Sequence, residues 1–390
     1  MQRAGAVAAR AGRFLLLSIR TLLAGGIALV GRILAFCETW LTEAKHARYG
    51  IAVMRIILGF TGLGLLLSNF TARSYLYGPA SFWNGEHETP KSAFPDIWLF
   101  GLGRALAGDL MAFTFYYLLV AALAALLILG WRTRIVLPIF LVLWIGLIEL
   151  NDASGDQGDN AYRICLFWLM FADSAGRLSL DARRRDRRPS SRSRFVRTWQ
   201  GERLLPAWLG NTAHNLVLVI LTAQVSFIYA AGALYKAGGD PWAEGIAVYA
   251  PLQVAKFGTW PFLSDLVTAW APAVVLASWG SILLQMSFPF MLLHRFTRVI
   301  ALVGILGFHV SIGVLMGLPW FSLAMVAIDA IFVRDVTWQK MGRAVRDAWR
   351  RAGRDADAQA PPPSSDDEAP AHRPAREKKE ARALAGAGRR

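Results

Sequence analysis

Charged residues are scarce in this chain, and their scarcity sets the class of protein before any motif is considered. Only 18% of the 390 residues are Asp, Glu, Lys or Arg, whereas 55% are hydrophobic and the mean hydropathy is +0.38. A soluble domain carries about 25% charged residues. The composition therefore excludes an ordinary soluble protein and predicts a multi-pass membrane protein whose first partner is the lipid bilayer.

Other absences narrow the class further. Cysteine occurs only at Cys37 and Cys165, which the topology below places near opposite faces, so no disulfide framework is expected. The apolar segments lack the polar alternation of barrel strands, which leaves helices as the spanning element. No inverted repeat or pair of broken helices is visible, which disfavours a transporter. No small-residue cleavage site followed by a polar start is evident, so a cleaved signal peptide is not expected.

What the chain does contain is a series of long apolar runs. Windows of about 17 to 25 residues predict spans, and shorter ones fit inside a bundle. The eight predicted spans are residues 50–69, 111–130, 135–150, 161–175, 214–235, 268–293, 299–316 and 320–333. The sequence thus predicts an all-α, polytopic helical membrane bundle with about eight transmembrane helices. An N-terminal amphipathic helix is predicted in addition.

The distribution of Lys and Arg predicts the orientation of this bundle. The connections 131–134, 177–213 and 294–298 carry 14 Lys or Arg, whereas the alternate connections carry four. Basic connections stay in the cytoplasm. We therefore expect a multi-pass protein of a bacterial-type plasma membrane with both termini cytoplasmic and Lys236 on the outer side.

The two ends of the chain are predicted to lie outside this bundle. Residues 14–36 are apolar but contain Arg20 and Arg32, which favours an amphipathic surface helix, with a ninth span as the alternative. The last residues are rich in Ala, Pro and charge, which is typical of disorder. Expected domains are a cytoplasmic amphipathic segment 1–45, a transmembrane domain 46–340 and a basic, mostly disordered cytoplasmic tail 341–390.

The net charge of +15 does not indicate a nucleic-acid partner. Most of the excess lies in the loop 182–194 and in the tail after Arg334. The positive-inside rule and attraction to anionic lipid headgroups account for basic segments in such places. No nucleic-acid binding is therefore expected.

Lys236 is the most informative single residue, because a lysine at the end of an apolar helix is expensive unless something uses it. It lies in the stretch YAAGALYKAGGDPWAEG, residues 229–245. This stretch resembles the signature of the horizontally transferred transmembrane (HTTM) family. That family groups vitamin K-dependent gamma-carboxylases with bacterial membrane proteins such as sporulation-delaying protein B.

Further segments support the resemblance over about residues 52–333. Residues 52–59, AVMRIILG, resemble the arginine-bearing first span of the family, and residues 129–134, LGWRTR, its tight cytoplasmic turn. Residues 171–181, FADSAGRLSLD, resemble the exit from its fourth span. Gly307, Phe308 and His309, followed by PWFSLAM at 319–325, resemble its late histidine-bearing helix.

The resemblance implies a chemical role for Lys236. In the carboxylases the matching lysine is taken as the base that deprotonates vitamin K hydroquinone, with a histidine matching His309 nearby. A lysine acts as a base only when neutral, because the ammonium has no lone pair. The resemblance thus implies Lys236 and His309 as catalytic residues and a quinone as the cofactor class. Both residues also have alternatives without a chemical role. Lys236 could be a snorkelling lysine whose amine reaches the headgroups, and His309 could form a structural hydrogen bond between helices.

Four more residues are candidate substrate ligands: Arg163, Asn160, Tyr229 and Trp242. Tyr229 and Trp242 flank Lys236 in the motif, although a tryptophan at this boundary also fits an aromatic belt. Arg163 begins the fourth span and suits either an anionic ligand or pairing with Asp156, Asp159 or Glu149.

Other polar residues have simpler readings. The loop containing Asp156 and Asp159 lacks a bidentate glutamate at the fixed spacing of a calcium loop, so no metal site is expected. Gln285 is predicted to make an interhelical hydrogen bond. Asp329 is predicted to pair with a basic loop residue. Arg55 is read as a structural residue that snorkels toward the cytoplasm. Residues 245–257 are predicted to lie flat on the outer interface, above Lys236.

The sequence departs from the carboxylases in two respects, and these leave two functions open. Asn160 stands where they carry a histidine, and the large extracytoplasmic domain that captures their protein substrates has no counterpart after residue 333. Carboxylation of protein glutamates is therefore not expected. One function is a quinone- or lipid-using enzyme with a lysine base. The other is a non-catalytic membrane module that helps mature or export a small secreted peptide, as in sporulation-delaying protein B.

Overall fold

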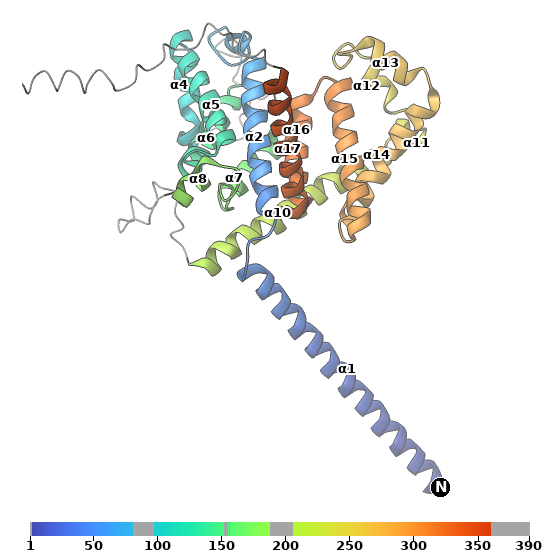
Figure 1. Cartoon of the computed structure of the whole chain (residues 1–390). Coiled ribbons are helices and arrows are strands. Elements are labelled where there is room, and N and C mark those ends of the chain that lie inside the picture. The colour runs from blue at the N-terminus through green and yellow to red at the C-terminus, as the bar shows by residue number, and fades with distance from the viewer. Residues whose placement is uncertain (1, 81–96, 152–154, 156, 188–205, 360–390) are drawn as a thin grey trace, which may run out of the picture. The chain divides into compact units, whose positions relative to one another are not determined.

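The computed structural model describes residues 2–80, 97–151, 155, 157–187 and 206–359, and these residues form helices and turns without a strand (Figure 1). The longer helices are α1 Gln2–Thr42, α2 Arg48–Ser68, α5 Leu110–Leu129, α6 Thr133–Ile148, α7 Gln157–Leu169, α10 Ala207–Ala237, α14 Ala271–Met291, α15 Arg295–Leu315, α16 Pro319–Asp329 and α17 Asp335–Gln359. The short ones are α3 Arg73–Leu76, η1 Trp98–Phe100, α4 Gly101–Leu106, α8 Leu180–Arg187, α11 Asp240–Ala243, α12 Tyr249–Gln253, α13 Pro261–Thr268 and η3 Ala330–Phe332. The prediction of an all-α helical bundle is confirmed.

Each of the eight predicted spans corresponds to one helix of the bundle. Within the described residues, six helical segments are long and apolar enough to cross a membrane, and five of them are predicted spans: α2, α5, α10, α14 and α15. The helices α6 and α16 with η3 are apolar but shorter. The predicted fourth span is shorter than expected, because α7 ends at Leu169 and the chain then turns back through the loop before α8.

The sixth candidate span belongs to α1, which was predicted to be a surface helix. Residues Leu16–Thr42 meet the length and hydropathy of a transmembrane helix, and none of that apolar window is buried in the protein. Among the side chains that the structure describes, apolar ones are exposed from Phe14 to Phe36. Such a helix suits the spanning alternative, because a surface helix needs a distinctly polar face.

The centre of the bundle is α2, which packs against α5, α7 and α16. Small residues on α2 allow backbones to approach closely, as in many membrane helix pairs. A Cβ atom at Gly59 would lie 3.1 Å from the carbonyl oxygen of Ala124 on α5. A Cβ atom at Gly50 would lie 2.7 Å from the carbonyl oxygen of Ala330 in η3. Larger side chains at either position would push these helices apart.

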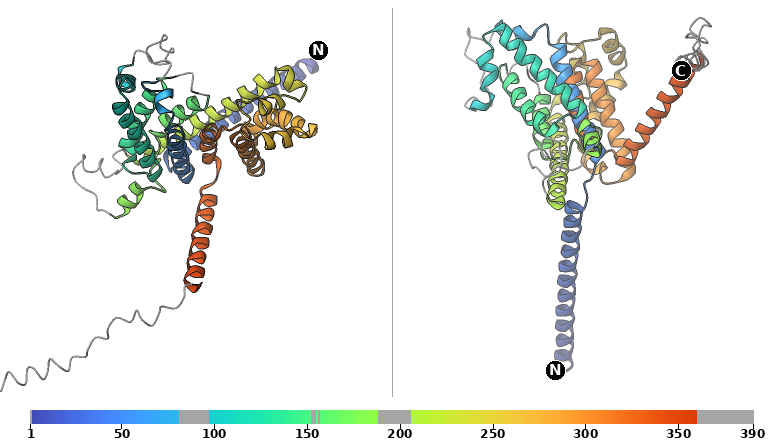
Figure 2. Two further views of the ribbon diagram at one scale, coloured as in Figure 1. Left: turned by 90° about the horizontal axis from the view of Figure 1, so that it is seen from above. Right: turned by 60° about the vertical axis from the view of Figure 1, so that its left-hand side comes forward.

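The helix α10 differs from its neighbours in direction. In Figure 1, α2 and α15 run up and down, whereas α10 crosses the bundle obliquely. The view from above in Figure 2 shows α10 lengthwise where α2 and α16 are seen along their axes. Its 31 residues make it long enough to pack against α7 near one end and α14 near the other. The C-terminal end of α10 therefore packs against the side of the helix pair formed by α14 and α15.

Arg55 is a structural residue, as predicted, but it does not snorkel. Its side chain is fully buried on α2. The guanidinium donates hydrogen bonds to the carbonyl oxygens of Ser174, at 3.2 Å, and Leu178, at 2.6 Å. It also lies against Gly130, whose φ of 64° closes the turn after α5. Three family-like segments, which are far apart in the sequence, thus meet around one buried arginine.

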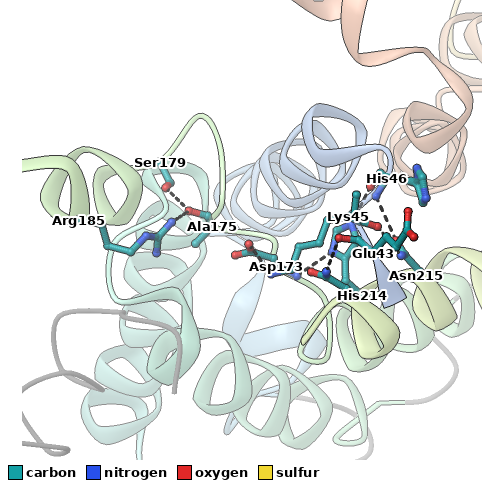
Figure 3. Close-up of polar contacts among 11 residues, drawn as sticks. Glu43, Lys45, His46, Asp173, Ala175, Ser179, Arg185, His214 and Asn215 are labelled. Atoms are coloured by element: carbon teal, nitrogen blue, oxygen red, sulfur yellow. Dashed lines mark hydrogen bonds and ion pairs between the residues drawn. The ribbon is translucent and has the colours of Figure 1, made fainter. Parts of the chain in front are cut away.

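The N-terminal part of α10 holds the connection between α1 and α2, and Figure 3 shows Asn215 and His214 beside Lys45 and His46. Asn215 donates from Nδ2 to the carbonyl oxygens of Trp40, Leu41 and Ala44, at 2.7 to 3.0 Å. His214 accepts at Nδ1 from the backbone N–H of Asp173, at 3.1 Å, so its Nε2 must carry the proton that it shares with the carbonyl oxygen of His46, at 2.7 Å. This fixes the imidazole as its neutral Nε2–H tautomer.

The chain divides into two units, Met1–Trp338 and Gln339–Arg390. In the second unit the structure describes the rest of α17, so residues 341–359 of the predicted tail are helical. Met341, Val345 and Trp349 are exposed on this helix, four residues apart, and basic residues occupy other faces. That pattern is typical of a helix at a membrane surface. The remainder of the tail lies outside the described residues.

Candidate functional site

The candidate site is built on the C-terminal third of α10. Tyr229 and Ala233 are buried there, and Lys236 is half-buried. Residues seven apart share one face of a helix, so Tyr229 and Lys236 point the same way about 10.5 Å apart along the axis. The helix ends directly afterwards at Ala237, because Gly238, Gly239 and Pro241 do not favour its continuation.

The Lys236 amine has a polar partner and two aromatic partners. Its Nζ donates a hydrogen bond to Oε1 of Gln285 on α14, at 2.7 Å. It also lies 5.1 Å from the ring centroid of Trp242 and 5.0 Å from that of Phe308. Both distances are within the range of a cation–π contact. The interhelical hydrogen bond predicted for Gln285 is thus confirmed, with Lys236 as its partner.

The amine lies near the middle of the helices that hold it. Gln285 is residue 15 of the 21 in α14, and Phe308 is residue 14 of the 21 in the antiparallel α15. Lys236 ends its own helix, yet it meets both neighbours well inside their length. Lys236 thus contacts α14 and α15 at an internal level of both helices, because α10 crosses obliquely and stops against the side of α14.

The segment directly after Lys236 packs along α14. The indole N–H of Trp279 donates to the carbonyl oxygen of Trp242, at 2.9 Å. The backbone N–H of Val248 donates to Oγ of Ser278, at 3.2 Å. The chain therefore proceeds from the level of Gln285 toward the beginning of α14. Trp242 contacts Lys236 through its ring, so this tryptophan, one of the predicted ligands, does lie at the site.

A second polar group, buried more deeply, lies beside the lysine. Tyr229, His309 and Asp329 come from α10, α15 and α16, and their exposed fractions are 1%, 1% and 6%. The Tyr229 hydroxyl donates to Oδ2 of Asp329 at 3.2 Å and lies 3.2 Å from Nε2 of His309. A phenol has one proton, so a hydroxyl that donates to Asp329 accepts from a protonated Nε2.

Two atoms of this network have no hydrogen-bond partner among the described residues. They are Nδ1 of His309 and Oδ1 of Asp329. An unsatisfied buried polar atom costs about 1 to 3 kcal/mol, and ionisable side chains inside a membrane bundle mark functional sites. The network therefore offers two unused acceptor positions in the protein interior.

Phe308 connects the two groups. Its ring contacts the Lys236 amine on one side and lies 5.1 Å from the His309 ring, centroid to centroid. Tyr229 belongs to the buried network and shares a helix face with Lys236. The structure thus brings together four of the six predicted site residues: Lys236, His309, Tyr229 and Trp242.

The other two predicted residues, Arg163 and Asn160, belong to a separate group on α7. Arg163 forms an ion pair with Glu149 at 3.2 Å and a hydrogen bond with Asn160. Asn160 also donates to Gln157, at 3.2 Å. Of the partners predicted for Arg163, Glu149 forms an ion pair with it, and Asp156 lies outside the described residues. The helix α16 packs against α7, which carries this group, and against α15, which carries His309.

Asp329 is the site residue that the sequence interpretation missed. It was predicted to pair with a basic loop residue, but it is buried and accepts from Tyr229. The available signal was a carboxylate within an apolar span, where an ionisable residue is rare and usually paired inside the bundle. Gln285 is likewise a polar residue within an apolar span, and for it the sequence did predict an interhelical hydrogen bond.

Comparison with known proteins gives one match. A family model for the HTTM domain matches residues 46–338. The matched region begins after α1, includes every helix of the bundle and ends within α17. Neither curated proteins nor solved structures provide a significant match.

Proposed function

Because the chain belongs to the HTTM family and is a multi-pass membrane protein, we propose that it is a membrane enzyme in which Lys236 removes a proton from a lipid-soluble quinol or phenol. The observation that carries the proposal is the position of the Lys236 amine, which lies between Gln285 and two aromatic rings inside the bundle. A purely snorkelling lysine directs its amine to the headgroups instead.

Access from the bilayer supports a lipid-soluble substrate. Lys236 is half-buried, and the adjacent residues Leu234 and Tyr235 are exposed on the outside of the bundle. In a membrane this surface faces acyl chains. An apolar aromatic substrate therefore reaches the amine without crossing water, and the rings of Trp242 and Phe308 provide faces on which it stacks.

The proposed proton transfer is simple and balanced. The neutral amine accepts the hydroxyl proton of the substrate, which leaves an ammonium on Lys236 and an aryloxide on the substrate. Gln285 and the two rings then stabilise the ammonium by the contacts already described. Their preorganisation favours the charged product of the step over its neutral starting state.

The buried network of Tyr229, His309 and Asp329 is the group of ionisable side chains beside Lys236. Nδ1 of His309 and Oδ1 of Asp329 are both acceptors with no partner among the described residues. Tyr229 links these two side chains through one hydroxyl. The Phe308 ring lies between this network and the Lys236 amine, so the proton taken from the substrate stays on Lys236 and is not passed to His309 directly.

The test uses purified full-length protein in lipid nanodiscs supplied with a reduced naphthoquinone in air. Deprotonated hydroquinone passes two electrons to dioxygen, giving quinone and hydrogen peroxide, so loss of quinol absorbance reports on the base. The protein is expected to accelerate this loss. Lys236→Arg is expected to abolish the acceleration, because arginine stays protonated. Quenching of tryptophan fluorescence should show that the variant still binds quinol.

Lys256→Arg is the matched control, since Lys256 is exposed and lies outside this cluster. It should keep the full rate. A wild-type rate in Lys236→Arg contradicts a lysine base. The absence of any acceleration by the wild-type protein contradicts the enzyme proposal and leaves the accessory role in peptide maturation as the surviving hypothesis.

A further inference from the structure

A second candidate binding site lies far from Lys236 along α10, near the beginning of that helix. A cavity of about 530 Å³ is lined by the N-terminal part of α6, the loop after α7, the helix α8 and the first turns of α10. Pockets for small ligands usually measure about 300 to 1,000 Å³. The cavity lies among the connections that the distribution of Lys and Arg predicts to be cytoplasmic.

The charge of this cavity is predominantly positive. Four basic side chains line it, namely Lys45, Arg132, Arg134 and Arg185, against the two carboxylates of Asp173 and Asp181. Figure 3 shows Lys45 beside Asp173, and Arg185 donating to the carbonyl oxygen of Ala175 at 2.6 Å. The surplus of basic groups favours an anionic ligand.

Both carboxylates are committed to structural contacts. Asp173 forms an ion pair with Lys45 at 2.8 Å. Asp181 accepts from the backbone N–H groups of Arg132, at 2.9 Å, and Thr133, at 2.8 Å, and so caps the beginning of α6. A capping carboxylate is held by the helix it caps. Arg132, Arg134 and Arg185 supply three guanidinium groups on the α6 and α8 side of the cavity.

Much of the remaining lining is apolar, although Thr133, Ser174 and Asn211 also contribute, and this apolar part favours an occupant that is not a small water-soluble anion. It includes Leu137, Pro138, Leu169, Met170 and Phe171. Phe171 is half exposed, on the loop where the chain leaves α7. A ligand that matches both the basic and the apolar part of the lining has an anionic headgroup and an apolar body.

We propose that this cavity binds the phosphate headgroup of an anionic phospholipid from the cytoplasmic leaflet, with the upper part of an acyl chain against Met170 and Phe171. Guanidinium groups match phosphate geometry with paired N–H donors. Basic pockets between transmembrane helices on the cytoplasmic side hold anionic headgroups in this way. This inference does not depend on chemistry at Lys236.

The test measures lipid binding directly. Full-length protein in detergent is titrated with phosphatidylglycerol or with phosphatidylcholine, and bound lipid is counted by native mass spectrometry. Phosphatidylglycerol is expected to bind at least tenfold more tightly. Arg134→Gln is expected to weaken its binding about fivefold or more, whereas phosphatidylcholine binding should not change. The control Arg343→Gln removes an exposed arginine of α17, which does not line the cavity, and should have no effect.

Two further measurements complete the test. One distinguishes binding of a lipid from binding of a free phosphate compound, and the other distinguishes loss of the site from misfolding of the variant. Glycerol 3-phosphate should compete poorly with phosphatidylglycerol, and Phe171→Gln should weaken the lipid several-fold without altering the glycerol 3-phosphate affinity. An unchanged thermal midpoint shows that each variant is folded. Equal binding of the two lipids, or wild-type affinity in Arg134→Gln, overturns the proposal. Equal affinity for glycerol 3-phosphate and phosphatidylglycerol overturns the lipid assignment.

Discussion

The amine of Lys236 and the amide oxygen of Gln285 are joined by a hydrogen bond of 2.7 Å that connects α10 to α14. The bond places a basic side chain well inside the length of α14, because Gln285 is residue 15 of 21 in that helix. Lys236 is therefore both the end of one helix and an internal contact of another. Its depth in the bundle, its bond to Gln285 and its neighbours can each be tested.

The depth of Lys236 predicts its reactivity in intact cells. A water-soluble, membrane-impermeant amine reagent is expected to modify the exposed Lys256 and to spare Lys236, whereas a permeant analogue should modify both. The physical reason is that the Lys236 amine is enclosed by Gln285, Trp242 and Phe308. Peptide mass spectrometry after labelling measures the two sites. Equal labelling by the impermeant reagent contradicts a position inside the bundle.

Removal of the polar partner of Lys236 should destabilise the bundle. Gln285→Leu is expected to lower the free energy of unfolding in detergent by about 1 kcal/mol, the usual magnitude for an interhelical hydrogen bond in a membrane protein. Gln224→Leu is the matched control, because Gln224 lies on α10 and has no hydrogen bond recorded among the described residues. Equal losses in the two variants would show that the bond to Lys236 contributes nothing.

Loss of the Tyr229 hydroxyl should affect two buried side chains at once. Tyr229→Phe removes the bonds to His309 and Asp329 and leaves both groups buried. The expected loss of stability is about 1 to 3 kcal/mol. Tyr235→Phe, at a side chain that is 86% exposed, should change stability little. Chemical unfolding followed by tryptophan fluorescence compares them, and a neutral Tyr229→Phe would exclude the network as a structural element.

Conservative replacement of Arg55 is expected to be poorly tolerated. Arg55→Lys keeps the charge but lacks the planar fork that reaches the carbonyl oxygens of Ser174 and Leu178. Hydrogen bonds to a buried charged group contribute about 1.5 to 3 kcal/mol each, so a loss of about 3 kcal/mol is expected. Arg20→Lys, on the exposed part of α1, is the comparison. A wild-type thermal midpoint for Arg55→Lys contradicts this assignment.

Much of the fold was predictable because apolar runs reveal membrane helices. The predicted boundaries of the span 50–69 and the observed helix α2, Arg48–Ser68, differ by two residues at most. The oblique course of α10 was not predictable in the same way, since hydropathy gives the length of a helix and packing sets its tilt. For this reason the sequence placed Lys236 near a helix end but did not identify Gln285 on α14 as its partner.

The candidate site was predictable in part. Lys236, His309, Tyr229 and Trp242 were found through one family-like stretch and one late helix, and they do gather. Asp329 was assigned the wrong partner, because the 100 residues that separate it from Tyr229 are bridged only in three dimensions. Arg163 and Asn160 carry suitable chemistry but contact Glu149 and each other on α7, which no pattern in a single sequence distinguishes from a position beside Lys236.

The hydrogen bonds from Asn215 to the connection between α1 and α2 have a consequence for biogenesis. The carbonyl oxygens of Trp40, Leu41 and Ala44 accept hydrogen bonds from a side chain more than 170 residues later in the chain. During synthesis these carbonyls leave the ribosome long before α10 does. The connection between α1 and α2 therefore lacks these hydrogen bonds until α10 is made, and a truncated product ending before Ala207 is expected to leave the three carbonyls exposed to membrane quality-control proteases.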